Sequence, residues 1–322
     1  MDFVRLGRTG LRVSVIGLGG GGHSRLGLST GATEAESVAL VGRALDLGVN
    51  FLDTAEAYGT ERIVGLGVRG RREDAIISTK KTIFKDERRI TPQELKQGLD
   101  ASLQLLGVER VEIYHLHAVK DADYDYAREH LVPALHELQT AGKIGFLGLT
   151  EQFAPDPGHI MMQRAVRDRC WDVVMVGFNI LNQSARERVF PLTLEHEMGV
   201  LNMFAVRQAL SQPETLRTTV EALIVEGKVA ADAIDDREAP LDFLVREGLA
   251  ESVTQAAYRF CRQEPGIHVV LSGTGNPAHL EENVKSLLQP PLPQTTRTRL
   301  MELFQGVDNV SGQMGPRINT GQ

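Results

Sequence analysis

The sequence contains little cysteine, few aromatic residues and no excess of basic residues. Cys170 and Cys261 are the two cysteines in 322 residues, which excludes a disulfide framework and a four-cysteine zinc or iron–sulfur site. Lys and Arg total 35 against 42 Asp and Glu, and the formal net charge of −7 argues against a nucleic-acid binder with a basic face. The hydrophobic fraction of 42% is nevertheless enough for a large core.

Long apolar runs are also missing. No stretch of about 18 apolar residues is present that could span a membrane. The first five residues lack the apolar segment of a signal peptide. We therefore expect a cytoplasmic protein that binds neither membranes nor nucleic acid.

Short runs rich in Val, Ile and Leu alternate with segments that have helical spacing. The predicted strands are 13–18, 51–52, 75–78, 111–117, 143–149, 173–178, 200–204 and 267–271. The predicted helices are 33–47, 60–68, 92–106, 126–140, 158–169, 184–198, 214–226, 241–247, 253–262, 277–288 and 295–304. Eight strand–helix units in series predict an α/β fold, a (β/α)8 TIM barrel.

The two ends of the chain extend this barrel. Residues 2–13 predict an N-terminal β-hairpin that closes the barrel floor. We expect one domain over 1–322, with the barrel at about 3–290 and a C-terminal helix and tail in 291–322. The tail from Gly306 is rich in Gly, Asn and Gln, and we expect it to be mobile. Residues 207–250 are the least regular part and predict a large loop.

Four compatible side chains follow three consecutive predicted strands. Asp53 and Lys80 follow the second and third strands, His117 ends the fourth, and Tyr58 lies five residues after Asp53. In a (β/α)8 barrel these strand ends form the active site. A tyrosine hydroxyl can give a proton to a carbonyl oxygen while a hydride reaches the carbon. An ammonium beside it favours the phenolate, a carboxylate holds the ammonium, and a histidine orients the substrate oxygen. Each residue alone has a structural explanation, but their convergence indicates catalysis.

Several motifs carry a resemblance to a known family. The stretch GVNFLDTAEAYG at residues 48–59 resembles the signature of the aldo-keto reductase superfamily. The segments ISTK at 77–80 and VEIYHLH at 111–117 resemble the strands that deliver its lysine and histidine. The opening at 6–14 and the segment at 272–283 are also typical. This resemblance implies a (β/α)8 barrel with the catalytic tetrad Asp53, Tyr58, Lys80 and His117.

The resemblance also implies a reaction. An NAD(P)-dependent oxidoreductase would interconvert a carbonyl (an aldehyde, ketone or sugar) and an alcohol by hydride transfer without a metal, as an aldo-keto reductase or an alcohol or sugar dehydrogenase. The partner is a small-molecule substrate, and the cofactor is NADP(H) or NAD(H). The residues implied in cofactor binding are Gly22, Asp53, Thr150, Glu151, Met175, Met203, Phe204, Val206, Arg207, Gly273, Thr274, Gly275, His279, Glu282 and Asn283. The residues do not indicate an oligomeric state.

Several cofactor positions depart from the family pattern. The family's Ser-Asn is replaced by Thr150-Glu151, its Gln by Met175, its stacking aromatic residue by Met203, and its basic pair by Gly273 and His279. That basic pair grips the 2′-phosphate of NADP in the family, so the preference between NADP and NAD stays open. Arg207 could recover a phosphate contact or form a surface salt bridge.

Three other interpretations follow from the residues. Residues 17–22 contain G-x-G-x-x-G after a strand, but a Rossmann fold would need a helix immediately afterwards. His115 and His117 share one face of a strand, with the spacing of two ligands in a metal-dependent hydrolase barrel. The altered cofactor positions also allow a nucleotide-binding regulatory barrel with little turnover. The tetrad favours the reductase.

Overall fold

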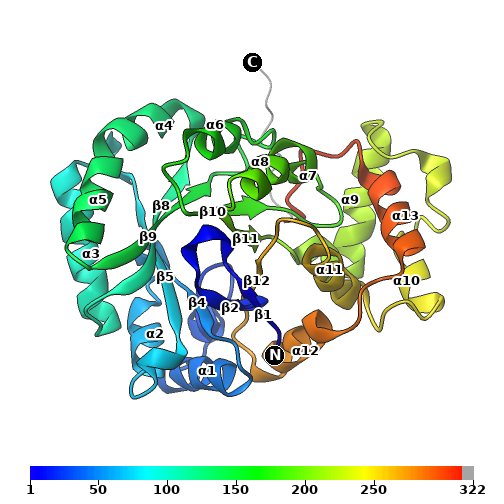
Figure 1. Ribbon diagram of the computed structural model, residues 1–322. Helices are drawn as coiled ribbons and strands as arrows, with labels where there is room; N and C mark the ends of the chain where they lie inside the picture. The colour runs from blue at the N-terminus through cyan, green and yellow to red at the C-terminus, as the bar shows by residue number, and fades with distance from the viewer. Residues whose placement is uncertain (314–322) are drawn as a thin grey trace.

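The computed structural model describes residues 1–313, and its centre is a closed barrel of eight parallel strands (Figure 1). The strands are β3 (Ile16–Gly19), β4 (Phe51–Asp53), β5 (Ile76–Thr82), β8 (Val111–Val119), β9 (Ile144–Glu151), β10 (Val173–Gly177), β11 (Gly199–Met203) and β12 (Val269–Ser272). Each pairs with the next, and β12 pairs with β3 to close the ring. The predicted (β/α)8 barrel is confirmed.

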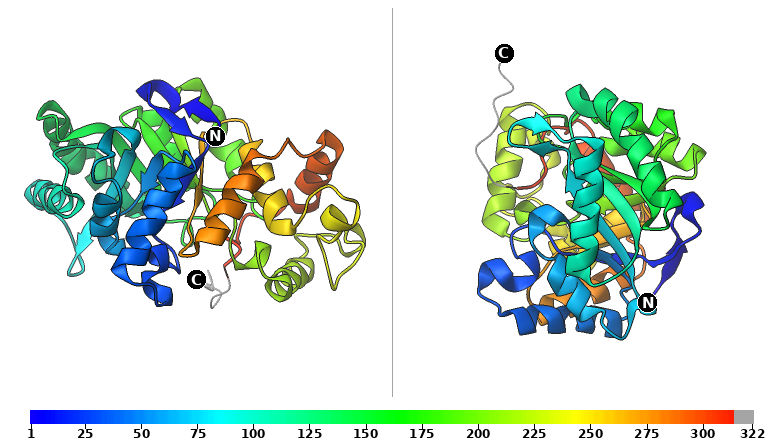
Figure 2. Two further views of the ribbon diagram at one scale, coloured as in Figure 1. Left: turned by 90° about the horizontal axis from the view of Figure 1, so that it is seen from below. Right: turned by 90° about the vertical axis from the view of Figure 1, so that its left-hand side faces the viewer.

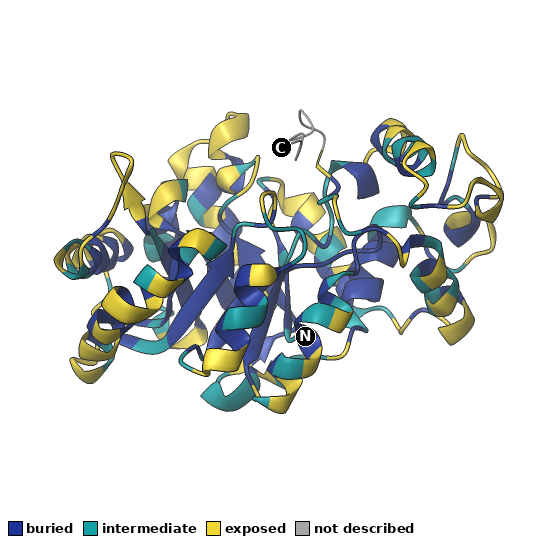
Figure 3. Ribbon diagram, turned by 90° about the horizontal axis from the view of Figure 1, so that it is seen from above, coloured by how far each residue is buried: buried dark blue, intermediate teal, exposed yellow. Residues whose placement is uncertain are grey.

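Helices cover the outside of the barrel, so that the strands are buried and the outward helix faces are exposed (Figure 3). The helices are α1 (Glu34–Asp46), α2 (Glu61–Gly67), α3 (Pro92–Leu106), α4 (Asp121–Tyr126), α5 (Val132–Thr140), α6 (Ile160–Asp168), α7 (Ala185–Arg188), α8 (Phe190–Glu195), α9 (Pro213–Val225), α10 (Phe243–Arg246), α11 (Val253–Arg262), α12 (Pro277–Leu288) and α13 (Gln294–Phe304). Thr33 and Thr91 form capping boxes at the starts of α1 and α3. Within residues 1–313, no helix is long and apolar enough to cross a membrane.

An N-terminal hairpin closes one end of the barrel, as predicted. Its strands β1 (Phe3–Arg5) and β2 (Arg12–Ser14) are antiparallel, and they lie across the barrel in Figure 1. The interior cluster that the hairpin completes consists of Leu6, Val13, Phe51, Ile113, Val173, Met175, Leu201 and Val269. Arg8 donates to Asp172 Oδ1 at 3.2 Å and to the carbonyl of Trp171 at 2.7 Å. This end is therefore filled, and a site belongs at the carboxyl ends of the strands.

Two predicted helices differ from those in the structure. The helix expected at 126–140 starts earlier, at Asp121, and contains a π turn (Ala127–Leu131) between α4 and α5. The helix expected at 184–198 is divided into α7 and α8 at Val189. Pro191 explains the division, because it has no N–H to donate into the preceding turn.

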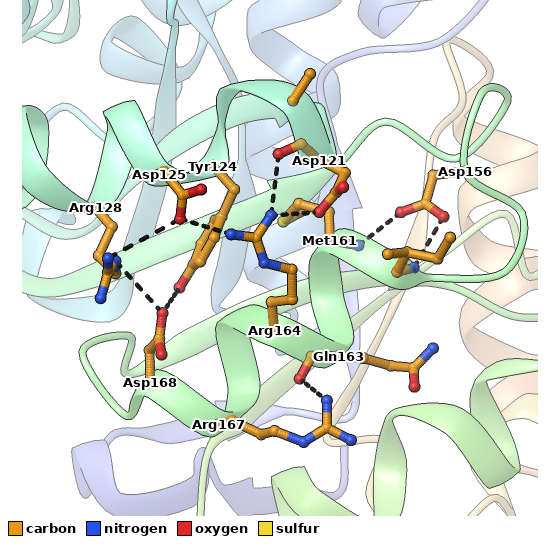
Figure 4. A network of polar contacts seen from close by, with 12 residues as sticks. Asp121, Tyr124, Asp125, Arg128, Asp156, Met161, Gln163, Arg164, Arg167 and Asp168 are labelled. Carbon is orange, nitrogen blue, oxygen red and sulfur yellow. Dashed lines mark hydrogen bonds and ion pairs between the residues drawn. The ribbon is translucent and has the colours of Figure 1, made fainter.

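Contacts between α4 and α6 fix the helices that follow β8 and β9 (Figure 4). Arg164 donates to Asp121 at 2.7 Å and to Asp125 at 2.6 Å. The hydroxyl of Tyr124 donates to Asp168 at 2.8 Å and accepts from the indole of Trp171 at 3.2 Å. These contacts hold the two strand ends in place from outside the barrel.

The region predicted as irregular forms a flank beside the barrel. Figure 2 shows α9, α10 and α13 together on this side. The guanidinium of Arg299 lies 3.8 Å from the ring centre of Phe243 and donates to Asp235 at 2.6 Å. A small hairpin of β6 (Phe84–Lys85) and β7 (Arg88–Arg89), which the sequence did not predict, follows β5. Strands of two residues are too short to show alternation.

The chain after α13 is fastened to the barrel. The amide of Asn182 donates to the carbonyl of Val310 at 2.9 Å, and that of Asn179 donates to the carbonyl of Ser311 at 3.1 Å. Residues 307–313 of the predicted tail therefore lie against the barrel and are hydrogen-bonded to it. The last residues of that tail, 314–322, lie outside the described residues.

Candidate active site

The strand ends bring the four predicted catalytic residues together. Asp53 is the last residue of β4, and Lys80 and His117 lie in the second halves of β5 and β8. Tyr58 ends a single 3-10 turn (Glu56–Tyr58) that follows β4. Parallel pairing places Asp53 opposite Ser78, so the carboxylate lies beside the strand that carries Lys80.

Asp53 and Lys80 form a buried ion pair. The ammonium of Lys80 donates to Asp53 Oδ2 at 2.6 Å and to the carbonyl of Thr54 at 2.8 Å. The hydroxyl of Ser78 donates to Asp53 Oδ1 at 2.9 Å. The side chains of Lys80 and Asp53 are 0% and 4% exposed, so both depend on these partners.

Burial and the neighbouring charges determine the protonation of this pair. Burial alone would lower the pKa of Lys80, but the Asp53 carboxylate and the Tyr58 hydroxyl together outweigh it and raise that pKa. Burial raises the pKa of Asp53, against the opposing effect of Lys80. Lys80 therefore keeps its positive charge next to Tyr58, with Nζ 4.9 Å from the ring centre.

Tyr58 also contacts His117. The Tyr58 hydroxyl lies 3.3 Å from His117 Nε2, and the two rings meet edge to face at 5.4 Å. Burial, with a smaller effect of Lys80, lowers the pKa of His117 to about 3. The imidazole is therefore neutral near pH 7 and can donate or accept a hydrogen bond without carrying charge.

The glycine-rich segment after β3 supports Tyr58 from the other side. A Cβ on Gly21 would lie 2.6 Å from Cε2 and Cζ of the Tyr58 ring. The N–H of Gly20 donates to the carbonyl of Asp53 at 2.6 Å. These glycines therefore let the backbone approach the ring closely. The helix that a Rossmann fold would need does not follow them, because a 3-10 segment (Arg25–Thr30) lies between them and α1.

A cavity of about 900 Å³ opens beside Tyr58. The predicted residues that line it are Gly22, Asp53, Tyr58, Met175, Met203, Phe204, Val206, Arg207, Gly273, Thr274, Gly275, His279, Glu282 and Asn283. Lys80 and His117 are not among the lining residues, but both contact Tyr58, which is. A volume of this order accommodates a large organic ligand.

Thr150 and Glu151 do not line the described cavity, although we expected them to bind the cofactor. Thr150 Oγ1 accepts the N–H of Ala118 at 2.7 Å. Glu151 accepts the N–H of Gly177 at 2.8 Å and lies 2.7 Å from His159 Nδ1. Both side chains are thus engaged between strands, with Glu151 3% exposed.

Other lining residues were not predicted. Among them are residues of the loop after β3, the start of α9, the start and middle of α11, and the end of the described chain: His23, Ser24, Gln212, Ser252, Thr254, Tyr258 and Gln313. A rule that reads only strand ends does not find residues on α11. The helical spacing of Thr254 and Tyr258 was the signal available, and it equally suits a core-facing helix.

Arg207 is the one lysine or arginine among the described lining residues. Its guanidinium lies 3.8 Å from the ring centre of Phe204 and donates to Gln313 Oε1 at 3.2 Å. No carboxylate in residues 1–313 pairs with it, so the structure shows no surface salt bridge here. Burial lowers the pKa of Arg207. An anionic ligand would supply the missing partner.

The cavity residues fit a dinucleotide. Gly22, Gly273 and Gly275 line the cavity, and an added Cβ on Gly22 would meet no atom within 4 Å, so a ligand can approach the backbone there. The helix α12 opens at the cavity after the Asn276 cap. The guanidinium of Arg207 suits phosphate. The start of α12 adds few donors, because Pro277 has no N–H and the N–H of Ala278 already donates to Asn276 Oδ1 at 2.9 Å.

The histidine pair on β8 has no metal-ligand set around it. No group of three or more His, Cys, Asp or Glu side chains in the described part of the chain is placed to hold a metal ion. His115 is 0% exposed, and burial, with Lys80, lowers its pKa well below 6.5. A Cβ on Gly148 would lie 2.2 Å from His115 Nδ1, so the imidazole fills the space of a missing side chain.

Comparisons with known proteins agree with this geometry. A family model described as Aldo/keto reductase family matches residues 15–303. L-galactose dehydrogenase from Arabidopsis thaliana is 35% identical over 152 residues, which are 45% of this chain and about half (47%) of that protein. Aldo-keto reductase YhdN from Bacillus subtilis is 26% identical over 303 residues, 87% of each chain. The solved structure of aldo-keto reductase AKR11C1 from Bacillus halodurans matches with a TM-score of 0.70 at 23% identity, over 94% of this chain and 96% of that one.

Proposed function

The chain belongs to the aldo/keto reductase family, and on that premise we propose that Tyr58 is its general acid and base. As a member of this family it is an NAD(P)-dependent oxidoreductase that interconverts carbonyl compounds and alcohols. The observation that supports the proposal is one set of contacts: Asp53 holds Lys80, Lys80 faces Tyr58, and Tyr58 meets His117.

Each of these residues has a separate task in the proposed reaction. When bound in the cavity, a reduced nicotinamide would supply the hydride for the carbonyl carbon. The Tyr58 hydroxyl gives its proton to the carbonyl oxygen, and the Lys80 ammonium stabilises the phenolate that remains. Asp53 fixes the ammonium in place. His117, with a pKa of about 3, is neutral and orients the substrate oxygen by a hydrogen bond rather than acting as an acid.

We propose that the cavity holds the dinucleotide with its nicotinamide end at Tyr58. Arg207 then pairs with a phosphate, because it faces the cavity and no carboxylate in residues 1–313 pairs with it. His279 and Glu282 lie one helical turn apart on α12 and both line the cavity. Neither is a lysine or arginine that could bind the 2′-phosphate of NADP(H). This lining supports NAD(H) as the coenzyme, because the part of α12 that lines the cavity provides no lysine or arginine for the 2′-phosphate that only NADP(H) carries.

The substrate class is proposed from a relative. The Arabidopsis protein is named an L-galactose dehydrogenase. We propose that this chain also acts on a sugar, at the anomeric carbon of a cyclic form or at a free carbonyl. Comparing kcat/KM for aldoses and sugar lactols with that for simple aldehydes and ketones tests this, and higher values for every simple aldehyde would contradict it.

The substitution Tyr58→Phe tests the catalytic role. We expect turnover, followed by nicotinamide absorbance, to fall by about 10³-fold or more, because general acid–base catalysis contributes about 10²–10⁴-fold. Coenzyme binding should change little. Tyr126→Phe is the matched control, because the Tyr126 hydroxyl donates to the carbonyl of Ile90, outside the cavity lining.

Two outcomes would overturn the proposal. Unchanged turnover in Tyr58→Phe would remove Tyr58 from the reaction. Tight coenzyme binding by the unaltered protein with no turnover of any carbonyl or alcohol would instead favour a nucleotide-binding regulatory barrel.

A further inference from the structure

The segment from Val307 to Gln313, here named the C-terminal strap, is fastened along its length. It bonds to segments that lie far from it in the sequence. The contacts are Asp308 with Lys228 and Arg188, Asn309 with Glu226, the carbonyls of Val310 and Ser311 with Asn182 and Asn179, the carbonyl of Gly312 with the N–H of Ala209, and Gln313 with Arg207. The strap ends at the cavity, which Gln313 lines.

Asn179 joins the strap to the loop after β11. Its amide nitrogen donates to the carbonyl of Phe204 at 3.0 Å and to the carbonyl of Ser311 at 3.1 Å. Its amide oxygen accepts the N–H groups of Leu181 and Asn182, both at 2.9 Å. Asn179 is 1% exposed, so one buried amide fixes both segments in relation to each other.

The loop that Asn179 holds is strained. Phe204 has a φ of 72°, in the left-handed region, which costs a residue other than glycine about 1–2 kcal/mol. Such a conformation persists when the surrounding contacts determine it. In this conformation the Phe204 ring lies 3.8 Å from the guanidinium carbon of Arg207 and forms the surface on which that group rests.

The strap also packs on the stem of Arg207. A Cβ on Gly312 would lie 3.2 Å from Arg207 Cβ and 3.8 Å from Ala209 Cβ, and Gly312 has a φ of 83°. A side chain at this position is strained and crowded against the arginine. The ring of Phe204 and the amide of Gln313 therefore hold the guanidinium, and Gly312 lies against the stem of the same side chain.

We propose that the C-terminal strap is a positioning element for coenzyme binding, and that it acts by holding Arg207 on the cavity wall. This inference rests on the proposed function, in which Arg207 pairs with a coenzyme phosphate. Asn179 and Gly312 are positioning residues, because their contacts reach the coenzyme through Phe204 and Arg207. An arginine already fixed in its binding conformation loses less conformational entropy when the phosphate arrives.

The test is a double-mutant cycle in the full chain, read out as the Kd of NADH and of NADPH by fluorescence titration. Gly312→Val should weaken the binding of the preferred coenzyme about tenfold. Gly142→Val is the matched control, because Gly142 has a similar φ of 74°, no atom within 4 Å of the added Cβ and no place in the cavity lining. It should leave Kd unchanged. Arg207→Met should weaken binding on its own, and Gly312→Val should then add less than a twofold effect.

The outcomes separate the strap from the coenzyme site. If Gly312→Val still weakens binding tenfold in the Arg207→Met protein, or has no effect while Arg207→Met does, the strap proposal is overturned and the phosphate role of Arg207 stands. If Arg207→Met leaves Kd unchanged, that phosphate role fails, and the strap proposal fails with it. Should Gly312→Val not fold, Gln313→Ala removes the amide that accepts from Arg207, and it should raise Kd about threefold only when Arg207 is present.

Discussion

Removing the charge of Asp53 should destabilise the protein strongly and abolish its activity at the same time. The ammonium of Lys80 lies 2.6 Å from the Asp53 carboxylate, and both side chains are almost completely buried. At an effective dielectric constant of about 20, their attraction is about 6 kcal/mol, which offsets much of the cost of burying two charges. Asp53→Asn keeps the shape but leaves a buried cation without its partner. Such a change costs about 3–5 kcal/mol.

The measurement is thermal unfolding alongside turnover. A loss of 3–5 kcal/mol lowers Tm by roughly 6–10 °C in a protein of this size, at about 2 °C per kcal/mol. The loss should be smaller at pH 9 than at pH 6, because the isolated Lys80 can then release its proton. The double variant Asp53→Leu with Lys80→Met removes both charges. Its Tm should recover most of the loss, while turnover stays abolished.

Two results would refute this reasoning. A Tm of Asp53→Asn within about 1 °C of the unaltered protein would mean that the pair is not a buried charge pair. A double variant that is less stable than Asp53→Asn alone would mean that Asp53 and Lys80 stabilise the fold through separate contacts.

Three more predictions concern acid stability, the glycine support of the tyrosine and a helix cap. Burial lowers the pKa values of His115 and His117 below 6.5, so the unfolded chain binds more protons and stability falls as pH drops below about 6.5. His117 should contribute about 2 kcal/mol of loss in urea unfolding between pH 7 and pH 5, and His115 should add a loss of the same sign. The substitution His117→Asn should reduce this pH dependence, and the same dependence in that variant would contradict the assignment. Gly21→Ala places a Cβ 2.6 Å from the Tyr58 ring, and kcat should fall at least tenfold, whereas an unchanged kcat would show that the ring tolerates the shift. Thr91→Ala removes the capping box of α3 and should cost about 1 kcal/mol in urea unfolding with kcat unaltered.

The sequence was sufficient to predict the barrel and its tetrad for a physical reason. Parallel strands place their carboxyl ends at one face, so residues that end strands far apart in sequence must meet, as Asp53, Lys80 and His117 do. The position of Glu151 at the end of β9 also predicts that it lies at this face, but it does not predict which side chain the carboxylate contacts. The carboxylate lies beside His159, a contact that depends on the path of the chain between β9 and α6.

The wall formed by the C-terminal strap could not be predicted from composition. Gly, Asn and Gln in a terminal segment usually indicate a solvated chain. Here the carbonyls of Val310 and Ser311 have partners, because Asn179 and Asn182 present amide groups from the loop after β10. Every residue has a backbone carbonyl, so the sequence does not indicate which carbonyls accept hydrogen bonds from side chains, and only the fold shows it.

Closure of the barrel by β12 and β3 has a consequence for the order of folding. β3 pairs with β4, which follows it closely along the chain, but its other edge pairs with β12, near the opposite end of the chain. During synthesis that edge of β3 has no partner until β12 has emerged. Pairing of such distant segments is slow, because the intervening chain must first be ordered. We therefore expect ring closure to be a late step of folding, which would leave an open strand edge on β3 until β12 pairs with it.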